Sequence, residues 1–477
     1  MNIRNSAIAG IIASGCSAIG LFVSFRISVE IIGLKAVGAW VLLQGLFFIS
    51  RIAEGGGGLN LTRAVAVNRK GDKPVWVGSY LIAGLWLVLG PALLIGLILI
   101  YPAEWILAEG FRVSVDTNTL RILIWLCFLN SLLSATAAVG LSVLEGCGKL
   151  TYRHAASIAS SLAYMTLPLV LIRDYEIIGL ALVYTVASAI QVLVAVCCLW
   201  ESEPLPRVPP SRIVGSLFKE SMRTSGMVLV RTGFEPLTKA LIGAFGTLAA
   251  VAAFDLALRV TTQARVLIQS ATQPLLYLGA RQQAPIDDNM RGIFSHAFRL
   301  VLRANCVGMA GLIIAAPTVV RFAFGERNAD AILFIIILTL GNLINSLGVV
   351  GYYLEASSGR MASLFRIHLL MLVINACGGL ILAIGADAVG STLSYALCFA
   401  YGGVALMTQA QRIHRVEVTK IIRANLPLLV WFLGVLVCQG ASMVIFRSDP
   451  LLVQVVLLSI AGLVLIPTYF FTDKFDS

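Results

Sequence analysis

Charged residues inside apolar segments are the side chains of this chain best placed to do chemistry. They gather in four apolar segments, at 7–29, 34–54, 223–245 and 247–277, whereas most other apolar segments are almost free of charge. An Arg at the bilayer centre costs about 2.5–3.5 kcal/mol, so several together must face one another or water. We therefore expect these segments to line one aqueous cavity whose substrate-binding cations are Arg26, Arg51, Arg231, Lys239, Arg259 and Arg265.

Three carboxylates accompany these cations and are candidates for ion coupling or for structural pairing: Glu54, Glu235 and Asp255. In segment 223–245, Arg231, Glu235 and Lys239 follow at helical spacing with Pro236 among them. A proline removes the hydrogen bond to the carbonyl four residues earlier and breaks or kinks a helix. We predict a hinge at Pro236, and a second candidate hinge at the glycine run Gly55, Gly56, Gly57 and Gly58.

Each of these features also has a structural interpretation, which the sequence leaves open. The glycine run also suits close helix approach. Arg299 and Arg303, at the start of segment 296–320, can reach toward water along their own stems. Three pairs at short helical spacing can simply neutralise each other: Arg26 with Glu30, Arg51 with Glu54, and Asp255 with Arg259.

The elements that must position these residues follow from composition. The chain has 477 residues, of which 58% are hydrophobic and 12% charged, and its mean hydropathy is +0.91. Soluble domains carry about 25% charged residues, so an ordinary globular enzyme and a disordered protein are excluded. We predict an all-α polytopic membrane protein with about fourteen spans: 7–29, 34–54, 75–101, 120–144, 155–172, 177–200, 223–245, 247–277, 296–320, 330–352, 364–385, 391–411, 425–446 and 451–472.

The distribution of bases predicts the orientation. With the N-terminus inside, 20 of the 35 Lys and Arg fall in cytoplasmic segments and 8 in outer ones. Such a bias sets the topology of membrane proteins. We expect both termini to be cytoplasmic and the protein to lie in a bacterial cytoplasmic (inner) membrane. The net charge of +11 is then the result of this bias, and we expect no nucleic-acid partner.

An internal repeat sets the predicted domains. The sequence Leu-Glu-Gly-Cys-Gly-Lys at 144–149 returns as Leu-Glu-Ala-Ser-Ser-Gly-Arg at 354–360, six spans later. An even number of spans makes the halves parallel repeats. We predict a six-helix lobe at 1–200, a cytoplasmic Pro-rich linker at 201–222, a second six-helix lobe at 223–423, and two further helices with a tail at 424–477.

Several signatures are missing from the sequence. It has no phosphate-binding G-x-x-x-x-G-K-[ST] motif, no C-x-x-C, and no cluster of residues typical of hydrolysis or metal binding. The four histidines lie near cytoplasmic helix ends, which argues against a histidine proton relay. We expect a transporter rather than an enzyme, with no cofactor and no metal. The energy source is left open among protons, sodium ions and the membrane potential.

The spans, the repeat and Ala253-Phe-Asp-Leu-Ala-Leu-Arg259 resemble the polysaccharide repeat-unit (O-antigen) flippases of the multidrug/oligosaccharidyl-lipid/polysaccharide (MOP) exporter superfamily. The resemblance implies a V-shaped pair of lobes like that of the multidrug transporters, working by alternating access. It implies an undecaprenyl-pyrophosphate-linked oligosaccharide as substrate, with a polysaccharide polymerase and other assembly proteins as partners. Related lipid II flippases carry cavity arginines on their first, second and eighth helices, where this chain has Arg26, Arg51 and Arg259 or Arg265.

The charge of the predicted cavity agrees with an anionic substrate. Its six cations outnumber its four carboxylates, which are Glu54, Glu235 and Asp255 together with Glu30. Arg binds pyrophosphate oxygens through its planar fork of N–H groups. A multidrug cation antiporter of the same fold is the alternative, but a carboxylate is expected in its first span and residues 8–25 contain none. A membrane glycan polymerase or transferase is less favoured, because the longest outer loop, at 102–119, is short.

Overall fold

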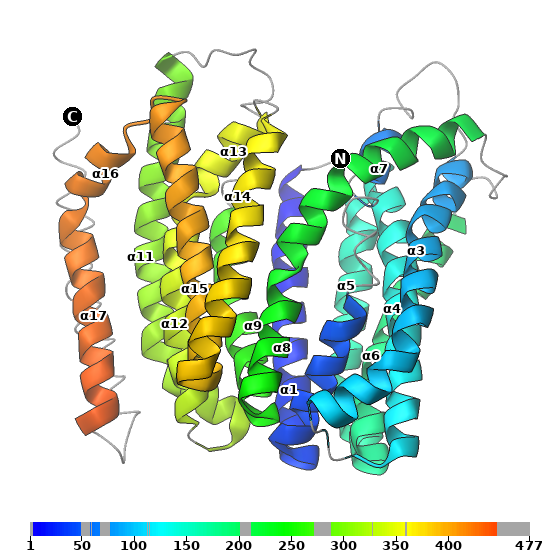
Figure 1. Ribbon diagram of the computed structural model, residues 1–477. Coiled ribbons are helices and arrows are strands. Elements are labelled where there is room, and N and C mark those ends of the chain that lie inside the picture. The colour runs from blue at the N-terminus through cyan, green and yellow to red at the C-terminus, as the bar shows by residue number, and fades with distance from the viewer. Residues whose placement is uncertain are drawn as a thin grey trace. The chain divides into compact units, whose positions relative to one another are not determined.

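Every regular element that the structure describes is a helix. The computed structural model describes residues 3–48, 58, 60–66, 77–111, 113, 115–200, 211–270, 288–326, 328–357 and 360–445. The chain divides into two compact units, residues 1–252 and 253–477. The all-α class predicted from composition is confirmed (Figure 1).

Unit 1 contains long apolar helices and three shorter ones near its end. Its helices are α1 (Ile3–Phe48), α3 (Val77–Trp105) with a π-helical extension η2 (Ile106–Gly110), α4 (Thr117–Gly146), α5 (Leu150–Thr166), α6 (Pro168–Trp200), α7 (Ser211–Thr232), α8 (Phe234–Phe245) and the start of α9 (Leu248–Ser270). One hydrophobic core of this unit joins α3, α4 and the end of α6, with Ala83, Val139 and Leu144 among its most buried residues.

Unit 2 is also built from long apolar helices, which are interrupted at other places than in unit 1. Its helices are the rest of α9, α11 (Asp288–Phe324), α12 (Ala329–Leu347), α13 (Val349–Ser357), α14 (Met361–Val373) with a π-helical extension η3 (Ile374–Gly378), α15 (Gly379–Arg412), α16 (Val418–Ala424) and α17 (Leu426–Ile445). Its core is built around α11, which packs on α12, α16 and α17. Phe294, Leu302 and Ile313 of α11 are fully buried there.

Seven helical runs among the described residues are long and apolar enough to cross a membrane, and α16 with α17 makes an eighth if that bent pair is one span. Some runs contain a break and therefore correspond to two predicted spans. The run Met361–Arg412 is 52 residues long, far more than the ~20 residues that a single crossing needs. The predicted fourteenth span, 451–472, lies outside the described residues.

The break between the first two predicted spans lies at Gly33. This residue has φ 80° and ψ 164°, so α1 consists of two helical arms. Glycine reaches positive φ without the clash that a Cβ would cause. The predicted span 7–29 ends before this residue, and the predicted span 34–54 begins directly after it.

The helices α6 and α15 each contain a tight reversal, and the two reversals match. Glu176 has φ 50° and ψ −125°, and Asp387 has φ 46° and ψ −127°. Three residues after each lies a glycine, Gly179 or Gly390, that touches the backbone of the preceding arm. The matching reversals are 211 residues apart, which confirms the predicted internal repeat.

A second pair of turns follows the same repeat. The N–H of Lys149 donates to the carbonyl of Leu144 at 2.9 Å, and the N–H of Arg360 donates to the carbonyl of Glu355 at 3.0 Å. Both bases stand immediately before a helix, with ψ 49° in each case. These are the two turns at which the sequence repeats itself, so the motif encodes a helix connection.

The predicted span 223–245 is broken. α7 ends at Thr232 and α8 begins at Phe234, so that Pro236 lies in the first turn of α8. The amide of Leu237 donates to the carbonyl of Gly233 at 3.2 Å, and Pro236 has no N–H to give to Thr232. The predicted break is therefore observed. Residues 211–222, which fall in the predicted linker, form the first half of α7.

Candidate functional site

Among the unit 1 residues whose burial is described, Lys239 on α8 is the most buried cation. Its side chain is 7% exposed, and its Nζ lies 2.5 Å from Oε1 of Glu235, one turn earlier. Phe234, Thr238 and Ile242 of the same helix are buried around it. The Glu235 side chain is 48% exposed, so one member of this ion pair is buried and the other is accessible.

The second arm of α1 packs against α8 in unit 1. Gly45 of α1 faces Pro236, where a Cβ would lie 3.8 Å from the Cα of the proline. A Cβ on Gly243 of α8 would lie 2.9 Å from Leu42 of α1. Because small residues permit this approach, the second arm of α1 runs beside α8.

Two further predicted cations of unit 1 are accessible. Arg26 lies on the first arm of α1, and its Nη2 is 3.5 Å from Oε2 of Glu30, whose side chain is 68% exposed. Arg231 is exposed in the last turn of α7. The helix break at Gly233 separates Arg231 from Glu235, and the carboxylate pairs with Lys239 instead.

The part of α9 that opens unit 2, residues 253–258, is buried on all sides. Residues 253–258 are each less than a tenth exposed, including the carboxylate-bearing Asp255 at 2%. Nε of Arg259 donates to Oδ2 of Asp255 at 2.6 Å, and the Arg259 side chain is 25% exposed. This pair therefore places one accessible guanidinium at the edge of the buried stretch 253–258.

Arg265, two turns further along α9, is held by groups from two other helices. Its Nη1 donates to Oδ1 of Asn342 on α12 at 3.2 Å. Its guanidinium carbon lies 5.3 Å from the ring centre of Phe399 on α15, the geometry of a cation–π contact. Both contacts orient the planar guanidinium.

A row of aromatic rings fixes α9 against α15 above this contact. Phe254 meets Tyr395 edge to face at 5.7 Å between ring centres, and Tyr395 stacks on Phe399 at 4.6 Å. Buried Asn342 also donates its Nδ2 to the carbonyl of Leu338, which fixes the amide orientation. The environment of Arg265 is thus rigid, as a binding group requires.

Part of the predicted site cannot be placed. Arg51, Glu54, Gly55, Gly56 and Gly57 lie outside the described residues. Gly58 is described, and a Cβ there would come within 3.0 Å of the Ser142 hydroxyl of α4. Nearby, Thr62 donates its hydroxyl to the carbonyl of Ser142 at 3.0 Å. Gly58 is therefore at a close helix approach, one of the two interpretations left open.

The sequence reasoning missed the uncharged partners and one buried pair. Asn342 and Phe399 hold Arg265, and an amide within an apolar span was the available signal. His414 donates or accepts at Nε2 across 3.0 Å to Oε1 of Glu355, and both side chains are buried. His414 was expected only to lie near a helix end, and its burial against a carboxylate depends on tertiary packing.

The comparisons with known proteins identify the fold. No family model and no curated protein sequence matches the chain. The lipid II flippase MurJ in its inward closed conformation matches with a TM-score of 0.73 and 14% identity, over 99% of this chain and 100% of that one. An inward-facing MATE family multidrug resistance transporter of the MOP superfamily matches with a TM-score of 0.66 and 14% identity, over 85% and 96%. The MATE multidrug transporter DinF-BH gives 0.64 and 15%, over 87% and 95%.

The class of protein follows from the spans and these structures. The chain is an integral membrane protein with the fold found in lipid II flippase and MATE transporter structures of the MOP superfamily. At 14–15% identity, the likeness concerns the fold alone.

Proposed function

We propose that this protein is a flippase that carries an undecaprenyl-pyrophosphate-linked oligosaccharide, such as an O-antigen or exopolysaccharide repeat unit, across a bacterial cytoplasmic membrane. The observation that carries the proposal is the environment of Arg265, oriented by the amide of Asn342 and the ring of Phe399. A lipid flippase has a similar fold over the full length of both chains. The proposed activity is transport, with no covalent chemistry.

A pyrophosphate is the anion that suits an oriented guanidinium. Arg donates two parallel N–H groups to such oxygens, and a low-dielectric setting strengthens each contact. Arg259 and Arg265 are six residues apart on α9. Arg265 is the one that contacts the amide of Asn342 and the ring of Phe399, whereas Arg259 pairs with Asp255. In our proposal these two arginines, with Arg26, Arg51, Arg231 and Lys239, form a cationic cavity.

The broken helix supplies the proposed moving part. α7 and α8 meet at Gly233, and Glu235 in the first turn of α8 is partly exposed while its partner Lys239 is buried. A change in the angle at this break alters the distance between Arg231 on α7 and Glu235 on α8, and hence the affinity of Glu235 for a coupling ion. Differential affinity of this kind is what couples an ion gradient to alternating access.

A multidrug cation antiporter is the second candidate, because two of the similar structures are MATE transporters. The described intramembrane groups argue against it. Five of the proposed cavity cations are described, against three carboxylates, Glu30, Glu235 and Asp255, and each of these carboxylates has a basic partner within 3.5 Å. A cationic drug would have to displace that partner from each carboxylate.

Binding by the purified protein separates the two candidates. We expect a prenyl-pyrophosphate oligosaccharide to bind, a prenyl alcohol of the same length to bind weakly, and a rhodamine cation to bind more weakly still. Arg265→Ala should weaken pyrophosphate binding at least tenfold, since a hydrogen bond to a charged group contributes about 1.5–3 kcal/mol. Arg366→Ala, on an exposed position of α14, is the control. Tight rhodamine binding that Arg265→Ala leaves unchanged would reverse the assignment.

A further inference from the structure

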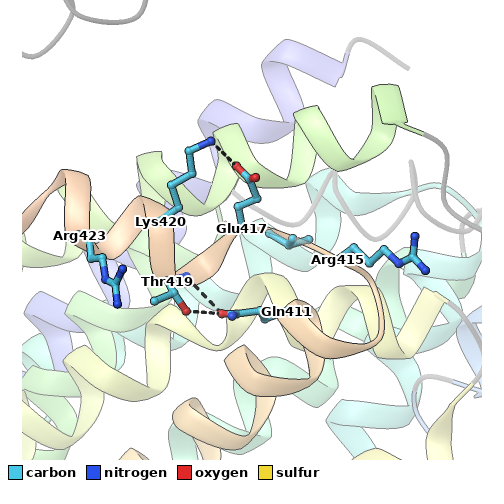
Figure 2. Close-up of a pocket in the computed structure, with 7 residues that line it drawn as sticks. Gln411, Arg415, Glu417, Thr419, Lys420 and Arg423 are labelled. Atoms are coloured by element: carbon cyan, nitrogen blue, oxygen red, sulfur yellow. Dashed lines mark hydrogen bonds and ion pairs between the residues drawn. The ribbon is translucent and has the colours of Figure 1, made fainter.

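The connection between α15 and α16 forms a pocket of about 460 Å³. Three bases and one carboxylate contribute to its lining. The backbone N–H and hydroxyl of Thr419 donate to Oε1 of Gln411 at 3.2 and 2.6 Å, which closes the base of the turn. Figure 2 shows Arg415 and Arg423 on opposite sides of this contact. The side chains that matter for the argument are Gln411, Arg415, Glu417, Thr419, Lys420 and Arg423.

The short helix α16 has one buried face and one basic face. Val418 and Ile421 are buried in the hydrophobic core that surrounds α11. Lys420 is 78% exposed, and its Nζ lies 3.1 Å from Oε2 of Glu417, whose side chain is 63% exposed. Arg423 is exposed one turn after Thr419. The helix therefore presents its bases outward while its apolar side is already occupied.

The elbow after α16 is held in place from the interior. α16 and α17 meet at 64°. Nε of Arg303 on α11 donates to Oδ1 of Asn425 at 3.2 Å, and Nδ2 of Asn425 donates to the carbonyl of Ile421 at 2.8 Å. Asn425 is 5% exposed. Arg303, which could have reached to water, instead fixes the angle at which the basic helix meets the apolar one.

An exposed apolar stripe begins immediately below the bases. Four large side chains of α17 are more than half exposed, at the spacing of one helix face: Leu426, Val430, Leu433 and Val437. The first of them is three residues after Arg423. A lipid could place its headgroup at the bases and an acyl chain along this stripe. A soluble anion would contact only the bases.

We propose that this elbow binds an anionic phospholipid, with the headgroup phosphate at Arg415, Lys420 and Arg423 and an acyl chain along α17. The three bases exceed the single carboxylate, Glu417, which gives the pocket a net positive charge at a span end. Basic residues next to a span attract anionic lipid with about 1 kcal/mol each. This site is independent of the transported substrate proposed above.

The test measures lipid binding to the full-length purified protein. Native mass spectrometry would give dissociation constants for phosphatidylglycerol and phosphatidylcholine on the parent, on Lys420→Gln/Arg423→Gln, and on the control Arg360→Gln/Arg366→Gln. The control removes the same charge from exposed positions of the same unit. We expect phosphatidylglycerol binding to weaken about fivefold for each base removed at the elbow, equivalent to ~1 kcal/mol per base. Binding of phosphatidylcholine should be unchanged.

Two results would overturn the site. If both double variants lose phosphatidylglycerol equally, the preference reflects overall charge and not the elbow. If soluble glycerol phosphate competes as well as the lipid does, the pocket binds free phosphate, and the stripe on α17 has no part in it. Leu433→Ser supplies the complementary measurement. It should weaken phosphatidylglycerol binding, and soluble glycerol phosphate should still fail to compete with the lipid.

Discussion

Glu176 and Asp387, 211 residues apart, have the same backbone conformation at the reversals of α6 and α15. Their φ values are 50° and 46°, and their ψ values are −125° and −127°. Each is an acidic residue in a conformation that L-residues rarely adopt. The two halves of the chain thus preserve a backbone turn where the side chains around it have diverged.

Replacing either residue by glycine should stabilise the protein. Positive φ disfavours a residue with a Cβ by roughly 1–2 kcal/mol, and glycine lacks this penalty. We expect Glu176→Gly and Asp387→Gly to raise the midpoint of thermal unfolding in detergent by a small but measurable amount. Asp174→Gly, an exposed acid in the helical arm just before the turn, should lower it. Equal loss of stability in all three variants would contradict the turn assignment.

The glycines that follow these turns should not tolerate a methyl group. A Cβ on Gly179 would overlap the carbonyl oxygen of Leu171, and one on Gly390 would overlap that of Leu382. Because the obstacle is backbone, we expect Gly179→Ala and Gly390→Ala to lower stability by several kcal/mol and reduce the amount of folded protein. Gly385→Ala meets nothing within 4 Å and should be neutral or mildly stabilising. Size-exclusion profiles and unfolding midpoints check both outcomes.

The fold was predictable from the sequence to the extent that it depends on local chemistry. The spans were predicted from the lengths of the apolar segments, and Gly33 separates the first two of them. Pro236 predicted the break between α7 and α8, since a missing N–H acts within one helix turn. α16 was not predicted, because a segment of seven residues with mixed polar and apolar side chains is too short to distinguish from a loop.

The site was predictable only in its charges. The pairs Arg26–Glu30, Glu235–Lys239 and Asp255–Arg259 are local and follow from i, i+4 spacing. The support of Arg265 is not local: Asn342 lies 77 residues away, and Phe399 lies on a different helix. Such partners depend on how three helices pack together, which the apolar pattern of one sequence does not specify.

The cap of α4 should make part of the stability dependent on pH. The backbone N–H and the hydroxyl of Thr119 and the backbone N–H of Asn118 hold the pKa of Asp116 below its usual value. A carboxylate with a lowered pKa stabilises the fold above its unfolded pKa, about 3.9, and loses this contribution as pH falls through the folded value. Asp116→Asn should cap the helix but remove this dependence. Unfolding midpoints between pH 5 and the acid limit of solubility provide the check.

Coupling at the broken helix is tested by Glu235→Gln and Pro236→Ala. Glu235→Gln leaves buried Lys239 without its carboxylate partner, so we expect ion-gradient-driven transport to be lost while substrate still binds. Pro236→Ala restores an N–H that can reach the carbonyl of Thr232, which should straighten the helix and slow transport. Glu417→Gln removes a carboxylate from an exposed pair and should change neither. If both test variants transport like the parent, α8 neither moves in the transport cycle nor couples it to an ion gradient.

The central claim is that the chain moves a lipid-linked pyrophosphate through a cationic site that contains Arg265. The most direct measurement is translocation in proteoliposomes of an undecaprenyl-pyrophosphate oligosaccharide, followed by access of an external glycosidase to the sugar. The parent should translocate, Arg265→Ala should lose at least nine-tenths of the initial rate, and Arg265→Lys should recover part of it, because lysine lacks the planar fork. Arg366→Ala should match the parent. No translocation by the folded parent, or an unchanged rate in Arg265→Ala, would contradict the account.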